Sequence, residues 1–229
     1  MQDLFDKHIQ PILEVKKPKT LMEIGVLTGG VTIKSLEYCK EFDAKLTSIE
    51  PVAWSGKIPE EIKPAAPGFD SSILGNAIVP EYVEKIYEIG LETNWNCIKS
   101  TSLQYLSSTD YKGFDCYLID GDHNYFTLYN ELSQLHRKTK PGDIIFMHDV
   151  GKWGRLDQYY NESNIPLEYL YSKKQGLLTA IEDFVKASTH TIYRRWRNHR
   201  IPFYRTKKQT WRYKTVTLEQ YGLGMLERL

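Results

Sequence analysis

The sequence is poor in cysteine, and none of its three cysteines is spaced like half of a pair. Cys39, Cys97 and Cys116 each lie in an apolar helix-like or strand-like pattern. A disulfide-stapled secreted scaffold and a cysteine-based zinc site both need closely spaced cysteines, so the pattern argues against both classes. We expect reduced core thiols, which are typical of a cytoplasmic protein.

Long apolar runs are also absent. No stretch approaches the ~18 apolar residues of a membrane-spanning helix, and the acidic start of the chain, with Asp3 and Asp6, lacks the pattern of a signal peptide. The sequence therefore predicts no membrane span and a cytoplasmic location. A chain of 229 residues suits one α/β domain with a substantial core, so we expect a single domain over residues 1–229.

A strong net charge is absent too, because 30 basic residues face 29 acidic ones. The balance is uneven, since residues 184–218 hold ten Lys and Arg and no Asp or Glu. Aromatic residues are interleaved with these basic residues, a composition that can bind nucleic acid, an acidic glycan, a sugar nucleotide or a partner subunit. It also fits an edge hairpin whose solvated charges discourage strand pairing, and we favour that interpretation.

The stretch from Thr20 to Gly30 organises the rest of the chain. A short buried strand ends at Gly25, a glycine-bearing turn follows, and apolar residues then recur at helical spacing. Glycines at such a turn let the backbone approach a ligand closely. Dinucleotide-binding folds carry the fingerprint G-x-G-x-x-G at this turn. Here Leu27 occupies the position of the second glycine, so the pyrophosphate of a dinucleotide would fit poorly.

Alternating strand-like and helix-like segments predict an α/β fold that is doubly wound. After the first strand, further strands are predicted over residues 45–49, 96–99, 114–119 and 144–147. The other predicted parts are an N-terminal helix over residues 1–18, a lid-like loop over residues 51–80 that is rich in proline and glycine, and basic, aromatic strands over residues 189–229.

Polar residues follow three of these strands. They are Glu50, the cluster Asp120-Gly121-Asp122-His123, and the pair His148-Asp149. Because the carboxyl ends of parallel strands share one edge, where open α/β sheets bind ligands, we expect these residues to lie together. Glu50 stands at about the distance at which nucleotide-binding folds place a carboxylate on ribose hydroxyls. Carboxylate oxygens suit magnesium or manganese, and histidine can accept a proton near neutral pH.

The spacing Glu23-x-Gly25-x-x-x-Gly29 resembles the first motif of Rossmann-like S-adenosylmethionine-dependent methyltransferases. The two polar clusters are similar to those of the family that includes metal-dependent sugar O-methyltransferases. The likeness spans about residues 20–149 and the last strand. It implies S-adenosylmethionine as cofactor and a mostly parallel seven-stranded sheet, with helices on both faces and an antiparallel C-terminal strand.

The resemblance also implies a role for each matching residue. The cofactor-binding set is Glu23, Gly25, Gly29, Glu50, Ser102 and Asp120. Ser102 matches a residue that borders the adenine ring, although it could instead cap the next helix. Asp120 and Asp149 match residues that hold a divalent cation, and His123 matches the base. Asp120 and His123 are therefore the predicted catalytic residues.

His148 departs from the relatives, which have an acid at that position. It could be a third metal ligand, a hydrogen-bond partner of Asp149 or a second base, and an enzyme without metal stays open. Imidazole suits manganese, iron or zinc better than magnesium. Asp122 could be an alternative ligand, or the cap of a helix that starts at His123.

These features predict an S-adenosylmethionine-dependent O-methyltransferase acting on a hydroxyl of a sugar, glycan or phenolic molecule, with Mg²⁺ or Mn²⁺ as the cation if one is needed. Oxygen is the favoured acceptor atom because the Asn/Asp-Pro-Pro-aromatic segment of base-modifying enzymes is missing. Two alternatives are a nucleic-acid methyltransferase that uses the basic segment and a non-catalytic adenosyl-binding module. The acceptor and the oligomeric state, including a homo-oligomer, are left open.

Overall fold

The computed structural model describes residues 1–26, 29–50, 81–151, 154–156, 174–194, 204–208 and 210–229. The strands are β1 (Thr20–Ile24), β2 (Lys45–Ile49), β3 (Trp95–Ile98), β4 (Cys116–Ile119), β5 (Ile144–His148), β6 (His190–Arg194), β7 (Tyr204–Lys208), β8 (Trp211–Thr217) and β9 (Leu223–Arg228). The helices are α1 (Gln2–Leu4), the π-helical turn η1 (Phe5–Ile9), α2 (Gln10–Lys16), α3 (Gly30–Phe42), α4 (Glu81–Glu88), the 3₁₀ turn η3 (Glu92–Asn94), α5 (Ser102–Ser107), α6 (Tyr125–Leu135) and α8 (Leu177–Ala187).

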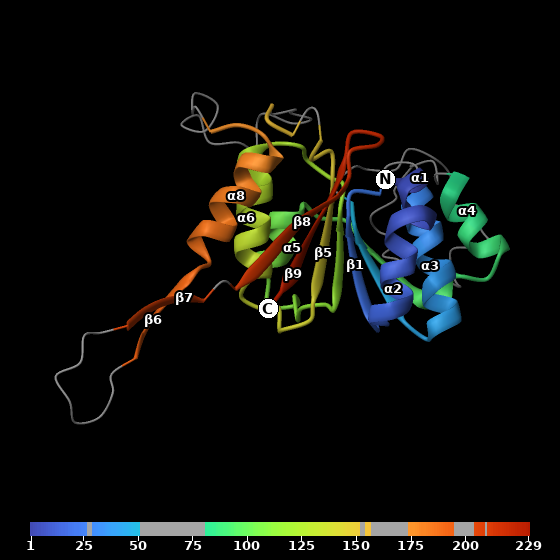
Figure 1. The fold of residues 1–229 in the computed structure, drawn as a ribbon. Coiled ribbons are helices and arrows are strands. Elements are labelled where there is room, and N and C mark those ends of the chain that lie inside the picture. The colour runs from blue at the N-terminus through green and yellow to red at the C-terminus, as the bar shows by residue number, and fades with distance from the viewer. Residues whose placement is uncertain (27–28, 51–80, 152–153, 157–173, 195–203, 209) are drawn as a thin grey trace.

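The main sheet has seven strands in the order β3-β2-β1-β4-β5-β9-β8 (Figure 1). The strands from β3 to β5 are parallel, and β9 pairs antiparallel with both of its neighbours. This confirms the predicted doubly wound, mostly parallel sheet with an antiparallel C-terminal strand. The chain moves outward from β1 to β3 and then returns to β4, so β1 and β4 flank the switch point at which such sheets bind ligands.

Strand register brings the candidate residues to one edge of the sheet. Ile24, the last residue of β1, pairs with Ile49 of β2 and with Ile119 of β4, and Ile119 pairs with Met147. These strands are buried almost throughout, as expected for parallel strands covered on both faces. The residues that follow the paired ends therefore emerge side by side.

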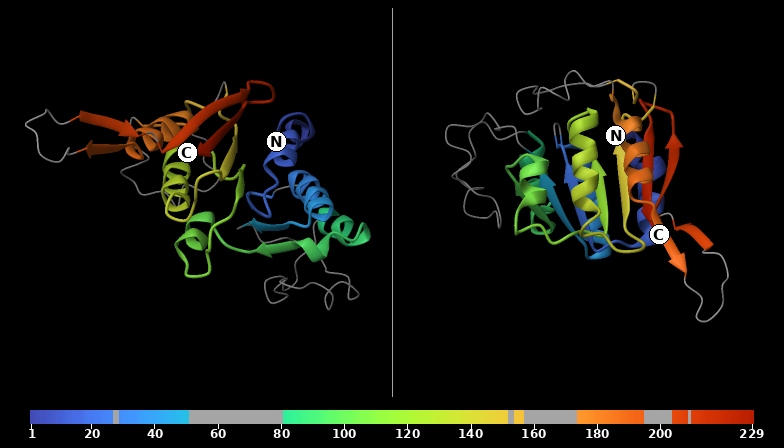
Figure 2. Two further views of the ribbon diagram at one scale, coloured as in Figure 1. Left: turned by 60° about the horizontal axis from the view of Figure 1, so that its bottom comes forward. Right: turned by 90° about the vertical axis from the view of Figure 1, so that its left-hand side faces the viewer.

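Two layers of helices enclose the sheet. The N-terminal helix, α3 and α4 cover one face, and α5, α6 and α8 cover the other (Figures 1 and 2). Each face has its own apolar cluster, with Leu36 and Ile86 buried in the first and Leu132 and Ile181 in the second. Burial of both faces fixes the sheet that carries the candidate site.

The N-terminal helix contains Pro11, which the sequence predicts to kink the helix or start it. Helical structure runs from Gln2 to Lys16, with the π-helical turn η1 immediately before α2. The Gln10 amide donates to the Phe5 carbonyl, five residues back. Proline has no amide hydrogen to donate and crowds the preceding turn, so a locally wider turn admits it without ending the helix.

Within the basic segment, β8 is an edge strand of the main sheet, whereas β6 and β7 pair antiparallel with each other as a ribbon outside that sheet. Figure 1 shows this ribbon projecting away from the body of the molecule. The predicted edge position holds for β8, but β6 and β7 share no ladder with it and are not part of the sheet edge. Alternation along a chain predicts a strand but does not select the strand's partner.

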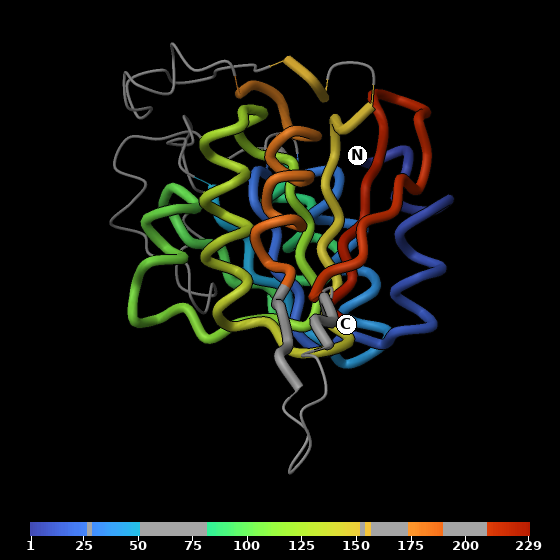
Figure 3. The backbone as a smooth tube through the Cα atoms, turned by 60° about the vertical axis from the view of Figure 1, so that its left-hand side comes forward, coloured from blue at the N-terminus to red at the C-terminus, as the bar shows by residue number. Residues whose placement is uncertain are grey.

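The two ends of the described chain, Met1 and Leu229, lie at opposite ends of the strands of the main sheet (Figures 1 and 3). The predicted lid-like loop over residues 51–80 lies outside the described residues, as does Leu27, the residue that argues against a bound dinucleotide. Among the residues that are described, no helix has the length and apolar character needed to span a bilayer.

Candidate active site

The glycine turn after β1 is shaped by contacts that only glycine permits. Gly25 has a φ of +87°, and a Cβ added to it would lie 2.5 Å from the Asp120 carbonyl oxygen. Gly29 has a φ of +73° and is the N-cap of α3, and a Cβ added to it would lie 2.2 Å from the Tyr82 ring. Any larger residue would separate the turn from β4 or from α4.

Glu23 is buried beneath this turn. Its Oε2 accepts hydrogen bonds from Thr32 Oγ1 at 2.8 Å and from Ser48 Oγ at 2.7 Å. Its Oε1 is buried with no hydrogen-bond partner among the described residues. Burial raises the pKa of Glu23 to about 7, and the two hydroxyl donors oppose that shift. A buried acceptor oxygen at a ligand-binding turn is available to a donor group of the ligand.

Glu50 is tied directly to the same turn. Its Oε2 accepts a hydrogen bond from the Val26 amide at 2.9 Å, and the residue is only 7% exposed. The acid that ends the second strand is thereby held against the backbone that follows the first. This contact fixes the predicted ribose-binding carboxylate relative to Gly25.

Ser102 is the first residue of α5, and its neighbour Thr101 is the N-cap. The Thr101 hydroxyl accepts from the Gln104 amide, and the Gln104 side chain accepts in return from the Thr101 amide. This capping box excludes the reading of Ser102 as the cap. Ser102 is buried and hydrogen bonds to Glu131 of α6. Burial raises the pKa of Glu131 to about 8, against the effect of that hydrogen bond.

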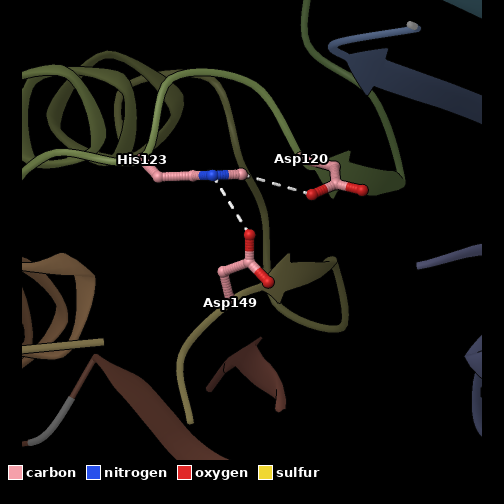
Figure 4. A group of neighbouring side chains, drawn as sticks. All are labelled: Asp120, His123 and Asp149. Atoms are coloured by element: carbon pink, nitrogen blue, oxygen red, sulfur yellow. Dashed lines mark hydrogen bonds and ion pairs between the residues drawn. The ribbon is translucent and has the colours of Figure 1, made fainter. Parts of the chain in front are cut away.

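Two carboxylates and two imidazoles form a cluster where β4 and β5 end. His123 Nε2 lies 3.3 Å from Asp120 Oδ1, and His123 Nδ1 lies 3.1 Å from Asp149 Oδ2 (Figure 4). His148 Nδ1 lies 3.0 Å from Asp120 Oδ1 and 3.0 Å from Asp149 Oδ1. The predicted catalytic and metal-binding residues are therefore brought together from two adjacent strands.

Electrostatics within the cluster couple these groups. Burial works against the charged form of Asp120, but hydrogen bonds from His123 and His148 outweigh it and hold the Asp120 pKa well below its usual range. Burial also opposes the charged form of His123, yet Asp120 and Asp149 outweigh it, so the His123 pKa is raised. Burial raises the pKa of Asp149, partly offset by the two histidines. The carboxylate charge makes His123 a stronger base than a free imidazole.

Asp122 lies outside this cluster, although it stands between Asp120 and His123 in sequence. Its Oδ2 accepts from Thr127 Oγ1 at 3.1 Å. Of the two roles left open for Asp122, the cap of a helix starting at His123 is ruled out: the helix begins at Tyr125, and Asn124 caps it by accepting from the Thr127 amide at 2.8 Å. Aspartate and asparagine both favour N-cap positions. Because the loop after β4 is longer than expected, the helix starts later and Asn124 becomes its N-cap.

The donor set fits a divalent cation. One ligand atom each from Asp120, His123 and Asp149 can be chosen so that all lie within 4.8 Å of one another. Asp149 Oδ1 is buried with no hydrogen-bond partner in the described part of the chain. Carboxylate oxygen with imidazole nitrogen is chemistry shared by manganese and related ions, and an unsatisfied buried oxygen gains from a positive charge.

The backbone at Asp149 adopts an unusual conformation. Its φ is +58°, in the left-handed region that few residues other than glycine occupy. Two residues later the Gly151 amide donates to the Tyr221 carbonyl at 2.6 Å, and Gly151 and Gly222 approach too closely for any side chain. The turn between β8 and β9 thus holds the strained segment that presents Asp149.

Several supporting residues were not predicted from the sequence. Thr32 and Ser48 orient Glu23, and Glu131 lies behind Ser102. The available signal was a polar residue within an otherwise apolar buried face, as for Ser48 in β2 and Glu131 in α6. The approach of the chain start was also missed: the Met1 amino group lies 3.6 Å from Asp120 Oδ2.

Comparison with known proteins gives the family and the fold. A family model described as a methyltransferase domain matches residues 22–150. A protein assigned as a caffeoyl-CoA O-methyltransferase from Staphylococcus aureus superposes with a TM-score of 0.53 at 12% identity, covering 100% of this chain and 82% of that one. No curated protein sequence matches the chain.

Two further solved structures share the fold and were crystallised with S-adenosylhomocysteine, written SAH in their descriptions. A methyltransferase from Podospora anserina has a TM-score of 0.51 at 12% identity, covering 95% of this chain and 75% of that one. An O-methyltransferase from Bacillus cereus has a TM-score of 0.50 at 15% identity, covering 96% and 78%.

Proposed function

Because this chain belongs to the methyltransferase domain family, we propose that it transfers a methyl group from S-adenosylmethionine to a hydroxyl oxygen of a small molecule, with a sugar or glycan as the favoured acceptor class. The observation that carries the proposal is the contact between Gly25 and the Asp120 backbone. It joins the predicted methyl-donor turn to the polar cluster without an intervening side chain. The donor and the group that activates the acceptor would then be neighbours, as a direct displacement requires.

The proposed cofactor site uses the residues that surround the glycine turn. Glu23 would accept from the ammonium group of the methionine part through Oε1, which has no partner among the described residues, and Glu50 would accept from the ribose hydroxyls. Gly25 and Gly29 would admit the cofactor against the backbone, and Asp120 would border it. Ser102, buried at the start of α5, would border the adenine ring.

Methyl transfer to oxygen needs an activated hydroxyl, since an alcohol is a weak nucleophile at neutral pH. A divalent cation bound by Asp120 and Asp149 would lower the pKa of a hydroxyl that it contacts. His123 is proposed as the base. Its Nε2 hydrogen bonds to Asp120, which orients the ring, and Nδ1 on the Asp149 side would take the hydroxyl proton.

The position of the basic ribbon supports a small acceptor over a nucleic acid. β6 follows α8, and β7 leads to Trp211 at the start of β8, which pairs with Arg228 at the end of β9. Arg228 lies at the edge of the sheet where β5 begins, whereas the polar cluster lies where β5 ends. The ribbon therefore leaves the molecule from the edge opposite the proposed chemistry (Figure 1).

The proposal is tested in two steps. Calorimetry should detect binding of S-adenosylmethionine and its demethylated product to the wild type. Release of the demethylated product should then follow addition of one member of a panel of sugars, sugar nucleotides and phenols, with Mn²⁺, Mg²⁺ or EDTA present in parallel. Failure of both nucleosides to bind would overturn the proposal. Methylation of nucleic acid, with steep salt dependence, would replace the small-molecule acceptor.

A further inference from the structure

We propose that His148 is a positioning residue: its Nδ1–H group holds Asp120 by a hydrogen bond, so that His148 neither binds the cation nor acts as a base. The inference rests on the proposed function, because it concerns how that site holds its cation. It assigns one of the three roles that the sequence leaves open for this residue. The argument depends on burial, on the two carboxylates that face the ring, and on the backbone between His148 and Asp149.

Neither ring nitrogen of His148 is open to an acceptor hydroxyl, because Nδ1 hydrogen bonds to Asp120 and Nε2 is buried. It is the last residue of β5, a strand buried along its whole length, and its side chain is 8% exposed. A general base must come within hydrogen-bond reach of the proton that it removes. His123 also contacts both carboxylates, but it projects from the loop after β4 and not from within a strand (Figure 4).

The two carboxylates determine which ring nitrogen carries the proton. His148 Nδ1 lies 3.0 Å from Asp120 Oδ1 and 3.0 Å from Asp149 Oδ1. An ionised carboxylate only accepts hydrogen bonds, so the hydrogen bond between His148 Nδ1 and Asp120 Oδ1 requires the proton to be on Nδ1. Nδ1 therefore has no lone pair to offer a cation. Nε2 is buried with no hydrogen-bond partner among the described residues, so no group there competes for the proton.

The two contacts of Nδ1 are not equivalent. The contact with Asp120 Oδ1 has hydrogen-bond geometry, whereas Asp149 Oδ1 at the same distance has no hydrogen-bond partner in the described part of the chain. His148 thus fixes Asp120 and leaves an oxygen of Asp149 unsatisfied beside it. An oxygen in that position is available to a cation that Asp120 also contacts.

The backbone explains how neighbouring residues reach one cluster. Successive side chains of a strand point to opposite faces, so His148 and Asp149 would normally diverge. The left-handed conformation of Asp149, with a φ of +58°, breaks this alternation. His148 then contacts both Asp120 and Asp149, and a ligand oxygen of Asp149 lies within 4.8 Å of one of Asp120. The strain is consistent with a segment shaped for its site, since such conformations persist where surrounding contacts enforce them.

The test uses Mn²⁺ alone as the probe, with the full chain and two substitutions. In His148→Asn the side-chain amide can donate from nearly the position of Nδ1, whereas His148→Leu keeps bulk and donates nothing. We expect His148→Asn to keep Mn²⁺ affinity near the wild-type value and His148→Leu to lose about 10-fold to 100-fold, the usual effect of removing a group that orients a metal ligand. Affinity for the demethylated cofactor should be unchanged in His148→Asn. Equal Mn²⁺ affinity in all three proteins would overturn the inference.

Two spectroscopic readouts distinguish a positioning role from direct ligation. Electron spin-echo modulation of bound Mn²⁺ should give the same ¹⁴N couplings in the wild type and in His148→Asn. Loss of a ¹⁴N coupling in that variant would overturn the inference. Histidine ¹⁵N spectra of the unmutated protein should show the proton of His148 on Nδ1, with and without Mg²⁺. A proton on Nε2 would overturn the inference even if His148→Leu fails to fold.

The result is separable from a failure of the proposed function. Wild-type protein that binds the demethylated cofactor but not Mn²⁺ would overturn the role of His148 in cation binding and leave methyl transfer intact. Protein that binds Mn²⁺ in the expected pattern but neither cofactor form would overturn the proposed function instead.

Discussion

The backbone of Gly25 rests directly on the backbone of Asp120. The Asp120 carbonyl oxygen lies 2.5 Å from the point where a Cβ on Gly25 would sit, and the Asp120 amide donates to the Ile24 carbonyl at 2.9 Å. The ladder between β1 and β4 thus continues one residue beyond the strands. Through this contact, the turn that would hold the methyl donor fixes the position of the Asp120 carboxylate, which would help to activate the acceptor.

Gly25→Ala should therefore affect more than the local backbone. The substitution adds left-handed strain and an overlap with Asp120, and we expect it to lower the free energy of unfolding by about 3 kcal/mol. The folded fraction should bind the demethylated cofactor weakly, because Asp120 must move. Chemical denaturation and calorimetry measure the two effects.

Gly142→Ala is the matched control for Gly25→Ala. Gly142 has a comparable φ of +97°, yet nothing lies within 4 Å of the Cβ position. Only the conformational cost of about 1 kcal/mol is expected, with cofactor affinity retained. If the two variants were destabilised equally, the contact between Gly25 and Asp120 would have no energetic importance.

Glu50→Gln tests the second acid of the proposed cofactor site. The amide oxygen of glutamine can still accept from the Val26 amide, so the turn should keep its shape. Loss of the negative charge should weaken binding of the demethylated cofactor roughly 10-fold to 100-fold, the usual value of a hydrogen bond to a charged acceptor. Calorimetry measures it, with Glu41→Gln at an exposed position of α3 as the control. Unchanged affinity would remove Glu50 from the cofactor site.

The sequence predicted the sheet edge and its polar residues because both depend on short-range patterns. Buried apolar runs predict the strands, and parallel strands of similar length bring their carboxyl ends together, which is why Glu50, Asp120 and Asp149 were assigned to one edge. Resemblance to the methyltransferase family, now supported by the match over residues 22–150, supplied the cofactor. Neither source depends on side-chain packing.

The features of the candidate site that the sequence did not predict depend on tertiary contacts, which no local sequence pattern encodes. The left-handed backbone of Asp149 has no glycine to mark it, and its support comes from the distant Tyr221 carbonyl through Gly151. A helix cap was one of two roles left open for Asp122, but Asn124 caps α6, because both residue types favour caps and the path of the chain after β4 decides between them. The partnership of Ser102 with Glu131 joins two helices, and only their packing brings the residues together.

Glu131 should make stability depend on pH. Its pKa is raised from an ordinary value of 4.5 to about 8 by burial. Below pH 4.5 the folded and unfolded states both hold the proton. Between that pH and about 8 the unfolded state releases the proton while the folded state keeps it, so stability falls as pH rises through this range.

Glu131→Gln should remove most of that dependence. The variant should match the wild type near pH 5 and exceed its free energy of unfolding by roughly 2–4 kcal/mol near pH 8. Urea denaturation at several pH values measures this. A smaller slope of the same sign should remain, because burial also raises the pKa of Glu23, to about 7. If the free energy of unfolding depended on pH in the same way in both proteins, ionisation of Glu131 would not destabilise the folded state.

Asp120→Asn and Asp122→Asn separate the cluster from its neighbour in sequence. Asp120 contacts both histidines of the cluster, whereas Asp122 accepts from Thr127 Oγ1 on α6, which the amide oxygen of asparagine can replace. Asp120→Asn should weaken Mn²⁺ binding at least about 100-fold, since removal of a ligand exceeds the effect of a supporting residue, and should abolish methyl transfer. Asp122→Asn should retain both. Thermal unfolding checks that each variant is folded, and Mn²⁺ titration with product-release assays supplies the comparison. Loss of Mn²⁺ binding in Asp122→Asn with retention in Asp120→Asn would move the cation site to the other acid.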